Sequence, residues 1–185
     1  MKRPSVHRRK LAPLLAAAII PWAGAEAGAH SASDAYLTLE AVQNVPSAAT
    51  NTAAVVHGQW DIALRDLHFA LELDDDGDGN IVWAELRKHQ NEIARYAFRH
   101  LRATAAGDAC TIVPTRQMVD GHADGAYAAL FFDIVCARAG VPIVLDYRMF
   151  FAIDPSHRGI LAFRSGSATS TALLSPDHPE VELKP

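Results

Sequence analysis

The chain has 185 residues, of which 50% are hydrophobic and 21% are charged, and its 17 Lys and Arg against 21 Asp and Glu give a net charge of −4. These values are typical of a globular domain that is long enough to bury a sizeable core. They exclude a disordered tail, a collagen-like fibre, a cysteine-stapled miniprotein and a basic nucleic-acid-binding protein, because none of these combines so high an apolar fraction with so mild a charge.

Residues 1–29 have the pattern of a cleaved signal peptide. Positions 1–10 hold five basic residues and no acidic one, and positions 11–25 carry no charge. The apolar run is shorter than the roughly 20 residues that a membrane-spanning helix needs, and it ends in small residues. Cleavage after Ala27 or after Ala29 fits the small-x-small rule, and we favour Ala29. The pair at 8–9, both Arg, leaves twin-arginine export open beside the general secretory route, which we favour.

Removal of residues 1–29 leaves a single exported domain, residues 30–185, that is clearly acidic. It holds 12 basic and 20 acidic residues, a net charge of −8. This balance argues against nucleic acid and anionic membrane surfaces as partners and favours cations or basic surfaces. We expect a periplasmic or secreted protein with no membrane span after cleavage.

The periodicity of the exported part predicts strands interrupted by one helical region. Alternating polarity predicts strands at 36–42 and 54–64, with a polar loop at 44–52 between them. Helical spacing then predicts a helix-loop-helix region over about 67–104, in which a long second helix runs from Trp83 to about Thr104. Further apolar and β-branched runs predict strands at 110–113, 126–136, 143–153, 159–164 and 168–174. The fold class is therefore α+β, with a mostly antiparallel, β-sandwich-like core and one EF-hand type insertion.

The acidic segment at 74–85 matches the twelve-residue calcium loop of an EF-hand. Asp74, Asp76 and Asp78 occupy loop positions 1, 3 and 5, where alternate side chains turn inward to give calcium its oxygen ligands. Gly79 occupies position 6, where the chain must turn so sharply that a side chain would obstruct it. The requirements are independent of one another, so the match predicts a calcium site.

The second half of the loop completes the ligand set. Asn80 at position 7 would supply its backbone carbonyl, and Val82 at position 9 has no oxygen, so water would fill that place. Glu85 at position 12 would close the shell with both carboxylate oxygens, which favours calcium over the smaller magnesium. Because sensor EF-hands work in pairs and this chain has one loop, we favour a structural ion over a sensing one. Ile81 then needs cover from another surface or from a second molecule.

Two cysteines, Cys110 and Cys136, remain after cleavage. In an oxidising compartment this pair, 26 positions apart, predicts one disulfide. Two buried free thiols are the alternative.

His30 is a second candidate metal ligand. Cleavage just before it would place a free amine and an imidazole on one residue, and cleavage before Gly28 would place His30 third in the chain; both arrangements suit nickel or copper. The alternative is an ordinary chain end without a ligand. No catalytic constellation is visible: the Ser-Gly-Ser at 165–167 lacks the frame of a nucleophile elbow, and there is no phosphate-binding glycine loop. We therefore expect a non-enzymatic protein.

Several stretches resemble the periplasmic amino-terminal region of the HupE/UreJ hydrogenase and urease accessory proteins. They are YLTLE at 36–40, GQWDIALRDL at 58–67, the calcium loop with WAEL at 83–86, and DPSHRG at 154–159. Members of that family typically continue into membrane helices that act in nickel or cobalt handling, whereas this chain ends at Pro185. The resemblance implies an exported domain that acts beside a separately encoded inner-membrane partner.

These observations predict a calcium-binding, non-enzymatic exported domain. The alternative function is an accessory module that captures nickel or copper through His30 and delivers it to a membrane permease.

Overall fold

The computed structural model describes residues 33–42 and 53–184, all of which belong to one unit of the chain, Ser31–Pro185. The predicted signal peptide, His30 and the predicted loop at 44–52 lie outside the described residues. Among the residues that are described, no helix combines the length and the apolar character that crossing a membrane requires.

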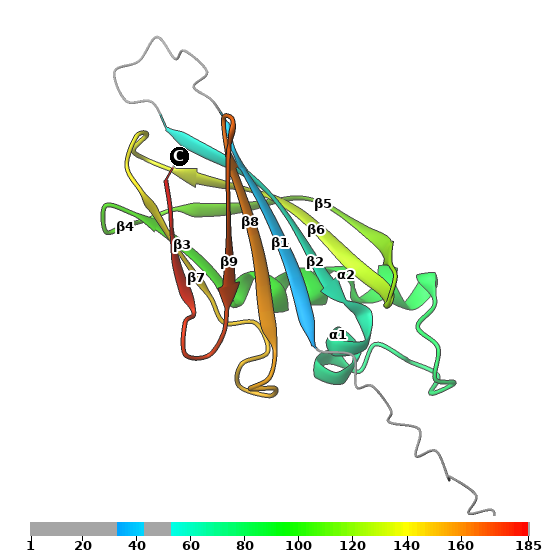
Figure 1. The fold of residues 1–185 in the computed structure, drawn as a ribbon. Helices are drawn as coiled ribbons and strands as arrows, with labels where there is room; N and C mark the ends of the chain where they lie inside the picture. The colour runs from blue at the N-terminus through cyan, green and yellow to red at the C-terminus, as the bar shows by residue number, and fades with distance from the viewer. Residues whose placement is uncertain (1–32, 43–52, 185) are drawn as a thin grey trace, which may run out of the picture. The chain divides into compact units, whose positions relative to one another are not determined.

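Six strands form the larger sheet, in the order β5-β6-β2-β1-β8-β9 (Figure 1). Neighbouring strands run antiparallel except β1 and β8, which are parallel, so the sheet is mixed. The strands are β1 (Asp34–Ala41), β2 (Ala54–Ala63), β5 (Thr111–His122), β6 (Gly125–Cys136), β8 (Arg158–Ser165) and β9 (Ala168–Leu174).

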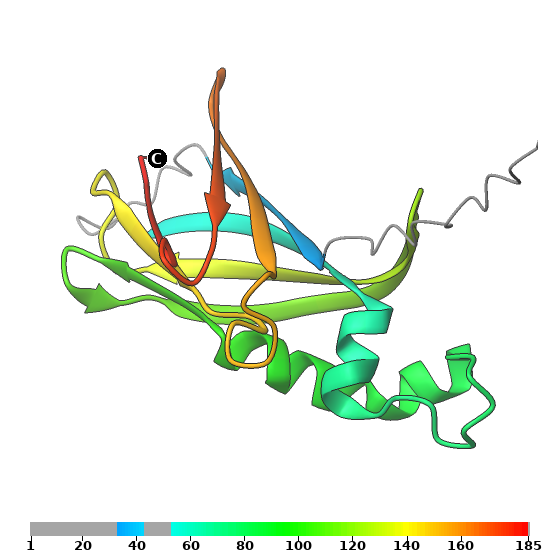
Figure 2. The same ribbon diagram turned by 60° about the horizontal axis from the view of Figure 1, so that its bottom comes forward.

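A smaller sheet and two helices complete the described fold. The smaller sheet is antiparallel throughout, in the order β10-β7-β3-β4. Figure 2 shows both helices on the same side of β2 and β6. The predicted α+β class with antiparallel pairing as the main pattern is confirmed at this level. The remaining elements are α1 (Leu64–Leu71), α2 (Trp83–Arg99), β3 (Leu101–Ala105), β4 (Asp108–Ala109), β7 (Ile143–Tyr147) and β10 (Glu180–Leu183).

The long helix ends earlier than its sequence pattern predicts. Leu101 continues the helical spacing of Ile93 and Ala97, which extended the prediction to about Thr104. In the structure α2 ends at Arg99, and the backbone N–H of His100 bonds to the carbonyl of Ala97. Residues 101–105 then alternate between buried and more exposed positions as strand β3. The period of two, supported by pairing with β7, prevails over the helical spacing.

The short strand β4 was not predicted, and three other strands differ from the prediction. The predicted strand at 143–153 ends at Tyr147, because the chain turns where Phe150 takes a positive φ of 58°. Strand β5 extends from the predicted run to His122, although its residues after Val113 are mostly exposed and show no apolar run. Strand β10 was not predicted, since Glu180–Leu183 is short and half acidic. Pairing with β6 and β7, rather than local hydrophobicity, forms the last two.

Aromatic rings join the sheets and α2 across the core. The ring of Trp60 on β2 lies 5.5 Å from that of Tyr147 on β7 and 6.4 Å from that of Phe98 on α2. Phe98 in turn lies 5.3 Å from Phe132 on β6, edge to face. Trp60, Tyr147 and Phe132 are almost completely buried. These ring contacts hold α2 against the larger sheet. They therefore also set the position at which the segment that leads into α2 must end.

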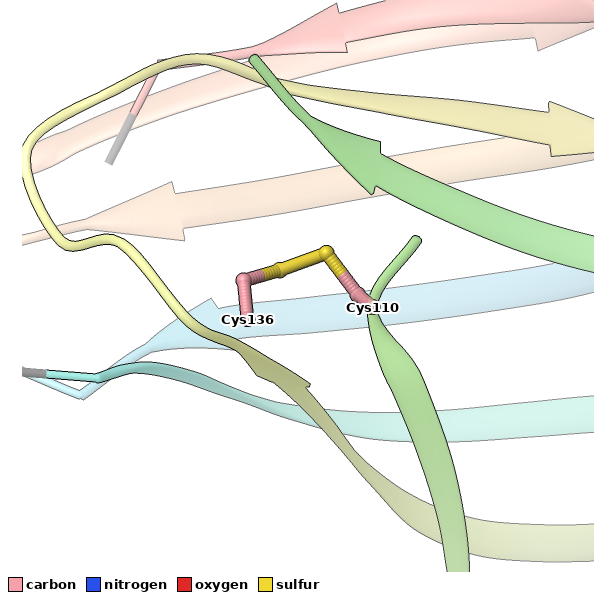
Figure 3. The surroundings of a disulfide bond; sticks show 2 residues. All are labelled: Cys110 and Cys136. Atoms are coloured by element: carbon pink, nitrogen blue, oxygen red, sulfur yellow. A yellow bond between two sulfur atoms is a disulfide. The ribbon is translucent and has the colours of Figure 1, made fainter. Parts of the chain in front are cut away.

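The predicted disulfide between Cys110 and Cys136 is confirmed (Figure 3). Cys110 directly precedes β5 and Cys136 ends β6, and their neighbours Thr111 and Val135 pair across the two strands. The bond therefore fastens the open end of the β5–β6 hairpin. Its presence agrees with an oxidising, extracytoplasmic compartment.

A chain of hydrogen bonds, buried at its Tyr147–His157 end, connects four separate elements. The Ser33 hydroxyl donates to Asp66 Oδ2 over 2.9 Å, so its oxygen accepts from His157 Nδ1 over 2.7 Å. With Nδ1 protonated, His157 Nε2 accepts from the Tyr147 hydroxyl over 2.6 Å. His157 and Tyr147 are fully buried. The chain ties the start of β1, α1, β7 and the start of β8 to one another.

Replacing Gly58 with Ala should destabilise the fold. A Cβ at this position would overlap the ring of Phe132, which lies directly over the glycine. Overpacking of this kind costs about 1 to 3 kcal/mol of unfolding free energy, measured by chemical denaturation. Gly121→Ala is the matched control, because a Cβ there meets nothing within 4 Å. Equal stability of the two variants would contradict this packing.

The stability of the domain should fall as pH drops from 6.5 to 4. Burial lowers the pKa of His157 to about 4, so the unfolded chain binds this proton first and protonation favours unfolding. The linked loss is about 3 kcal/mol across that window, and the contribution is fully present above pH 6.5. Denaturation at several pH values should show a shallower pH dependence for His157→Gln than for wild type. Parallel curves for the two proteins would contradict the assignment.

Candidate metal centre

The acidic loop, Asp74–Glu85, connects α1 to α2, and both of its ends are held by buried residues. Helix α1 ends at Leu71, and the next residue, Glu72, takes a left-handed conformation with φ 52° and bonds its N–H to the carbonyl of His68. Leu73 follows and is fully buried, while Leu86 is buried just after the loop. The core therefore sets the positions at which the loop begins and ends.

Asp74 organises the first half of the acidic loop. Its Oδ1 accepts the backbone N–H of Gly77 and its Oδ2 accepts that of Gly79, each over 2.8 Å. Both glycines have positive φ, 72° and 84°, and a Cβ would be strained in that conformation. The sharp turn predicted at Gly79 is therefore present, and Gly77 makes a second one.

The next two aspartates turn inward in the same way. Asp76 Oδ1 accepts the N–H of Asp78 over 3.2 Å, and Asp78 Oδ1 accepts the N–H of Asn80 over 2.7 Å. As a result, one carboxylate oxygen from each of Asp74, Asp76 and Asp78 lies within 4.8 Å of the others. The three groups form an exposed cluster that could hold a metal ion.

The pKa values of two aspartates in the cluster shift in opposite directions. Backbone N–H bonds, first that of Gly79, lower the pKa of Asp74 below its usual value. The N–H of Asp78 acts on Asp76 in the same direction, but the negative charge of Asp78, the loss of solvation and the charge of Glu85 together outweigh it and raise the pKa of Asp76. Like charges are thus held close together, an arrangement that a bound cation would stabilise.

Glu85 closes the loop without lying inside the aspartate cluster. Its Oε1 accepts the N–H of Asp75 and its Oε2 accepts the N–H of Val82, both over 2.8 Å. The second bond caps the N-terminus of α2 at a position where Val82 has no side-chain acceptor of its own. The carboxylate is buried and joins the second residue of the loop to the ninth.

Asp75 turns away from the cluster and pairs with α2. Its Oδ2 lies 2.7 Å from Lys88 Nζ, and its Oδ1 lies 3.1 Å from His89 Nε2. His89 also contacts Glu92 over 2.8 Å between Nδ1 and Oε2. These two partners of Asp75 were not predicted, because a separation of 13 and 14 residues across a loop has no fixed geometry until the fold is known.

The structure identifies what lies next to Ile81. This residue is half-buried and packs against the core. It also lines a cavity of about 340 Å³, opposite the turn of the β5–β6 hairpin, where Asp124 accepts a hydrogen bond from the Tyr127 hydroxyl over 2.9 Å. A surface of this same chain therefore lies near Ile81, on the other wall of that cavity.

The structure gathers some of the predicted ligands and leaves others untested. Asp74, Asp76 and Asp78 come together as predicted. Asn80 and Glu85 lie in the same loop, Asn80 exposed and Glu85 occupied with backbone N–H groups. That Glu85 caps α2 was not predicted from the sequence. The available signal was an acidic residue three positions after the first residue of the cap, but Val82 stands where such a cap usually has Ser or Thr.

Comparison of the chain with protein-family models and with curated protein sequences gives no match. The resemblance to the HupE/UreJ proteins accordingly stays a prediction.

Replacing Glu85 with Ala should destabilise the domain even when calcium is chelated. The substitution leaves the N–H groups of Asp75 and Val82 without their acceptor, which should lower the unfolding free energy by about 1 to 2 kcal/mol. Denaturation in the presence of a chelator measures the effect. Glu92→Ala removes a more exposed carboxylate on the same helix and should change stability by under about 0.5 kcal/mol. A loss for Glu85→Ala that disappears under chelation would show that Glu85 acts only through a metal.

Proposed function

We propose that this domain binds one calcium ion in the acidic loop as a single EF-hand. The observation that carries the proposal is the gathering of the Asp74, Asp76 and Asp78 oxygens within 4.8 Å of one another. The domain is exported and non-enzymatic, and its ion is structural. The disulfide supports the exported location, since such bonds persist in oxidising compartments.

The donor set suits calcium. It consists only of oxygens, which hard cations prefer, and calcium takes six to eight of them. The three aspartates, the carbonyl of Asn80 and a water beside Val82 would supply five positions. Glu85 would supply two more, because an ionised carboxylate has about four acceptor positions and can bind an ion while it keeps its bonds to Asp75 and Val82. Magnesium demands a smaller, octahedral shell and fits this set less well.

A structural ion follows from where the loop lies. The loop joins α1 and α2, and the ion would neutralise the aspartates that the backbone turns toward one another. In the described part of the chain the end of the β5–β6 hairpin, residues 124–127, lines the same cavity as Ile81, which supports a single loop without a second one beside it. An unpaired loop of this kind should bind calcium with a dissociation constant on the order of 10⁻⁴ M, as extracellular modules do.

The family resemblance extends the proposal to a partner. An exported domain similar to the periplasmic part of the HupE/UreJ proteins would act beside a separately encoded inner-membrane protein. The acidic balance of residues 30–185 would favour a basic surface on that protein.

Calcium should change both the Trp83 fluorescence and the melting temperature of the mature protein. Trp83 is 56% exposed and is the tenth residue of the acidic loop, so ordering of the loop alters its surroundings. Saturating calcium at 100 times the dissociation constant should stabilise the fold by about 2.7 kcal/mol. Titration of the chelated protein followed by fluorescence, and melting with and without calcium, measure the two effects.

Variants separate the ligands from their neighbours. Asp74→Ala should abolish the calcium response, and Glu85→Gln should weaken it by about tenfold or more. Asp75→Asn is the matched control, because it removes one charge from the same loop at a side chain that faces Lys88 and His89. A calcium response that survives in Asp74→Ala and Glu85→Gln, or none in the wild type, would contradict the proposed function.

A further inference from the structure

A second cavity lies beside α1, away from the acidic loop. Its volume is about 410 Å³, within the range that small-molecule sites occupy. Its walls come from three separate segments: the residue before β1, helix α1 and the turn between β7 and β8. None of the loop aspartates lines it. The lining residues that matter here are Ser33, Arg65, Asp66, Phe69, Ile153 and Asp154.

The polar side of this cavity presents oxygen acceptors in fixed positions. The Ser33 hydroxyl hydrogen points to Asp66, and the hydroxyl oxygen is held by the buried His157. Asp154 is oriented by Ser156, which donates both its backbone N–H and its hydroxyl to Oδ1, over 2.8 and 2.6 Å. The two carboxylates are therefore oriented by hydrogen bonds from Ser33 and Ser156.

The charge of the cavity is negative. Asp66 and Asp154 face one cation, Arg65, whose Nε lies 3.3 Å from Asp66 Oδ1. Burial raises the pKa of Asp66, so this carboxylate is less well solvated than an exposed one. A ligand that brings a positive charge with N–H donors would offset that loss of solvation.

The remaining walls are apolar and uncovered. Phe69 on α1 is 75% exposed and Ile153 in the turn is 46% exposed, although both line the cavity. Large apolar groups in the same cavity as two carboxylates are what an amphiphilic cation requires: apolar area for its body, and acceptors for its charge.

We propose that this cavity binds a small organic ammonium ion with an apolar body. The ammonium group lies between Asp66 and Asp154 and donates to their carboxylates, and the body lies between Phe69 and Ile153. The proposal does not depend on calcium, because its residues are separate from the acidic loop.

The test uses 2-phenylethylammonium as the probe and the mature chain as the protein. Calorimetric titration should show saturable binding with one site per chain, both with calcium and with chelator. Asp66→Asn and Asp154→Asn should each weaken binding about tenfold, since each removes one charge-assisted hydrogen bond. Phe69→Ala should weaken it severalfold, and this variant should fold because the side chain is mostly exposed.

Controls fix the chemistry of the site. Asp108→Asn removes the same charge at an exposed position paired with Arg138 and should leave binding unchanged. Phenylacetate, which has a similar body and the opposite charge, should not bind. No saturation by about 10 mM amine, equal binding of phenylacetate, or full binding in both Asp66→Asn and Asp154→Asn would overturn the proposal. Failure of the calcium titration alone would leave it standing, since the two sites share no residue.

Discussion

The carboxylate of Glu85 holds the two ends of the acidic loop together, and the geometry of the candidate metal centre depends on it. One oxygen binds the N–H of Asp75 at the start of the loop and the other binds the N–H of Val82 at its end. The same group caps α2, whose far end is fixed by the ring contacts of Phe98 with Trp60 and Phe132. Because Glu85 belongs to α2, the packing of α2 in the core also fixes the distance between the two loop residues that Glu85 binds.

Within that closed loop the backbone brings like charges together. Asp74 takes N–H bonds from Gly77 and Gly79, and its pKa falls, while Asp76 is close enough to other carboxylates for its pKa to rise. The hydrogen bonds aim the carboxylates, and the repulsion between them opposes the same arrangement. A divalent cation would remove the repulsion and keep the hydrogen bonds, which supports the structural ion that we propose for the loop.

Features that depend on residues close together in the sequence were mostly predicted correctly, whereas most features that depend on distant residues were not. The acidic loop was predictable because its glycines and aspartates act on neighbours within five residues, and the disulfide because two cysteines in an oxidising compartment have only each other. Strand β10 and the length of β5 were not, since both form by pairing with distant strands. The contact of Ser33 with His157 spans 124 residues and leaves no local pattern. Leu101 shows the opposite case, where a local helical spacing was real but the pairing of β3 with β7 prevailed.

The most direct test of this account is a crystal structure of the mature protein grown with calcium. We predict one ion in the acidic loop, with oxygens of Asp74, Asp76 and Asp78, the carbonyl of Asn80 and both oxygens of Glu85 at about 2.3 to 2.6 Å. The backbone of the loop should match the present structure. An acidic loop without an ion at saturating calcium, or an ion bound there without Glu85, would contradict the account.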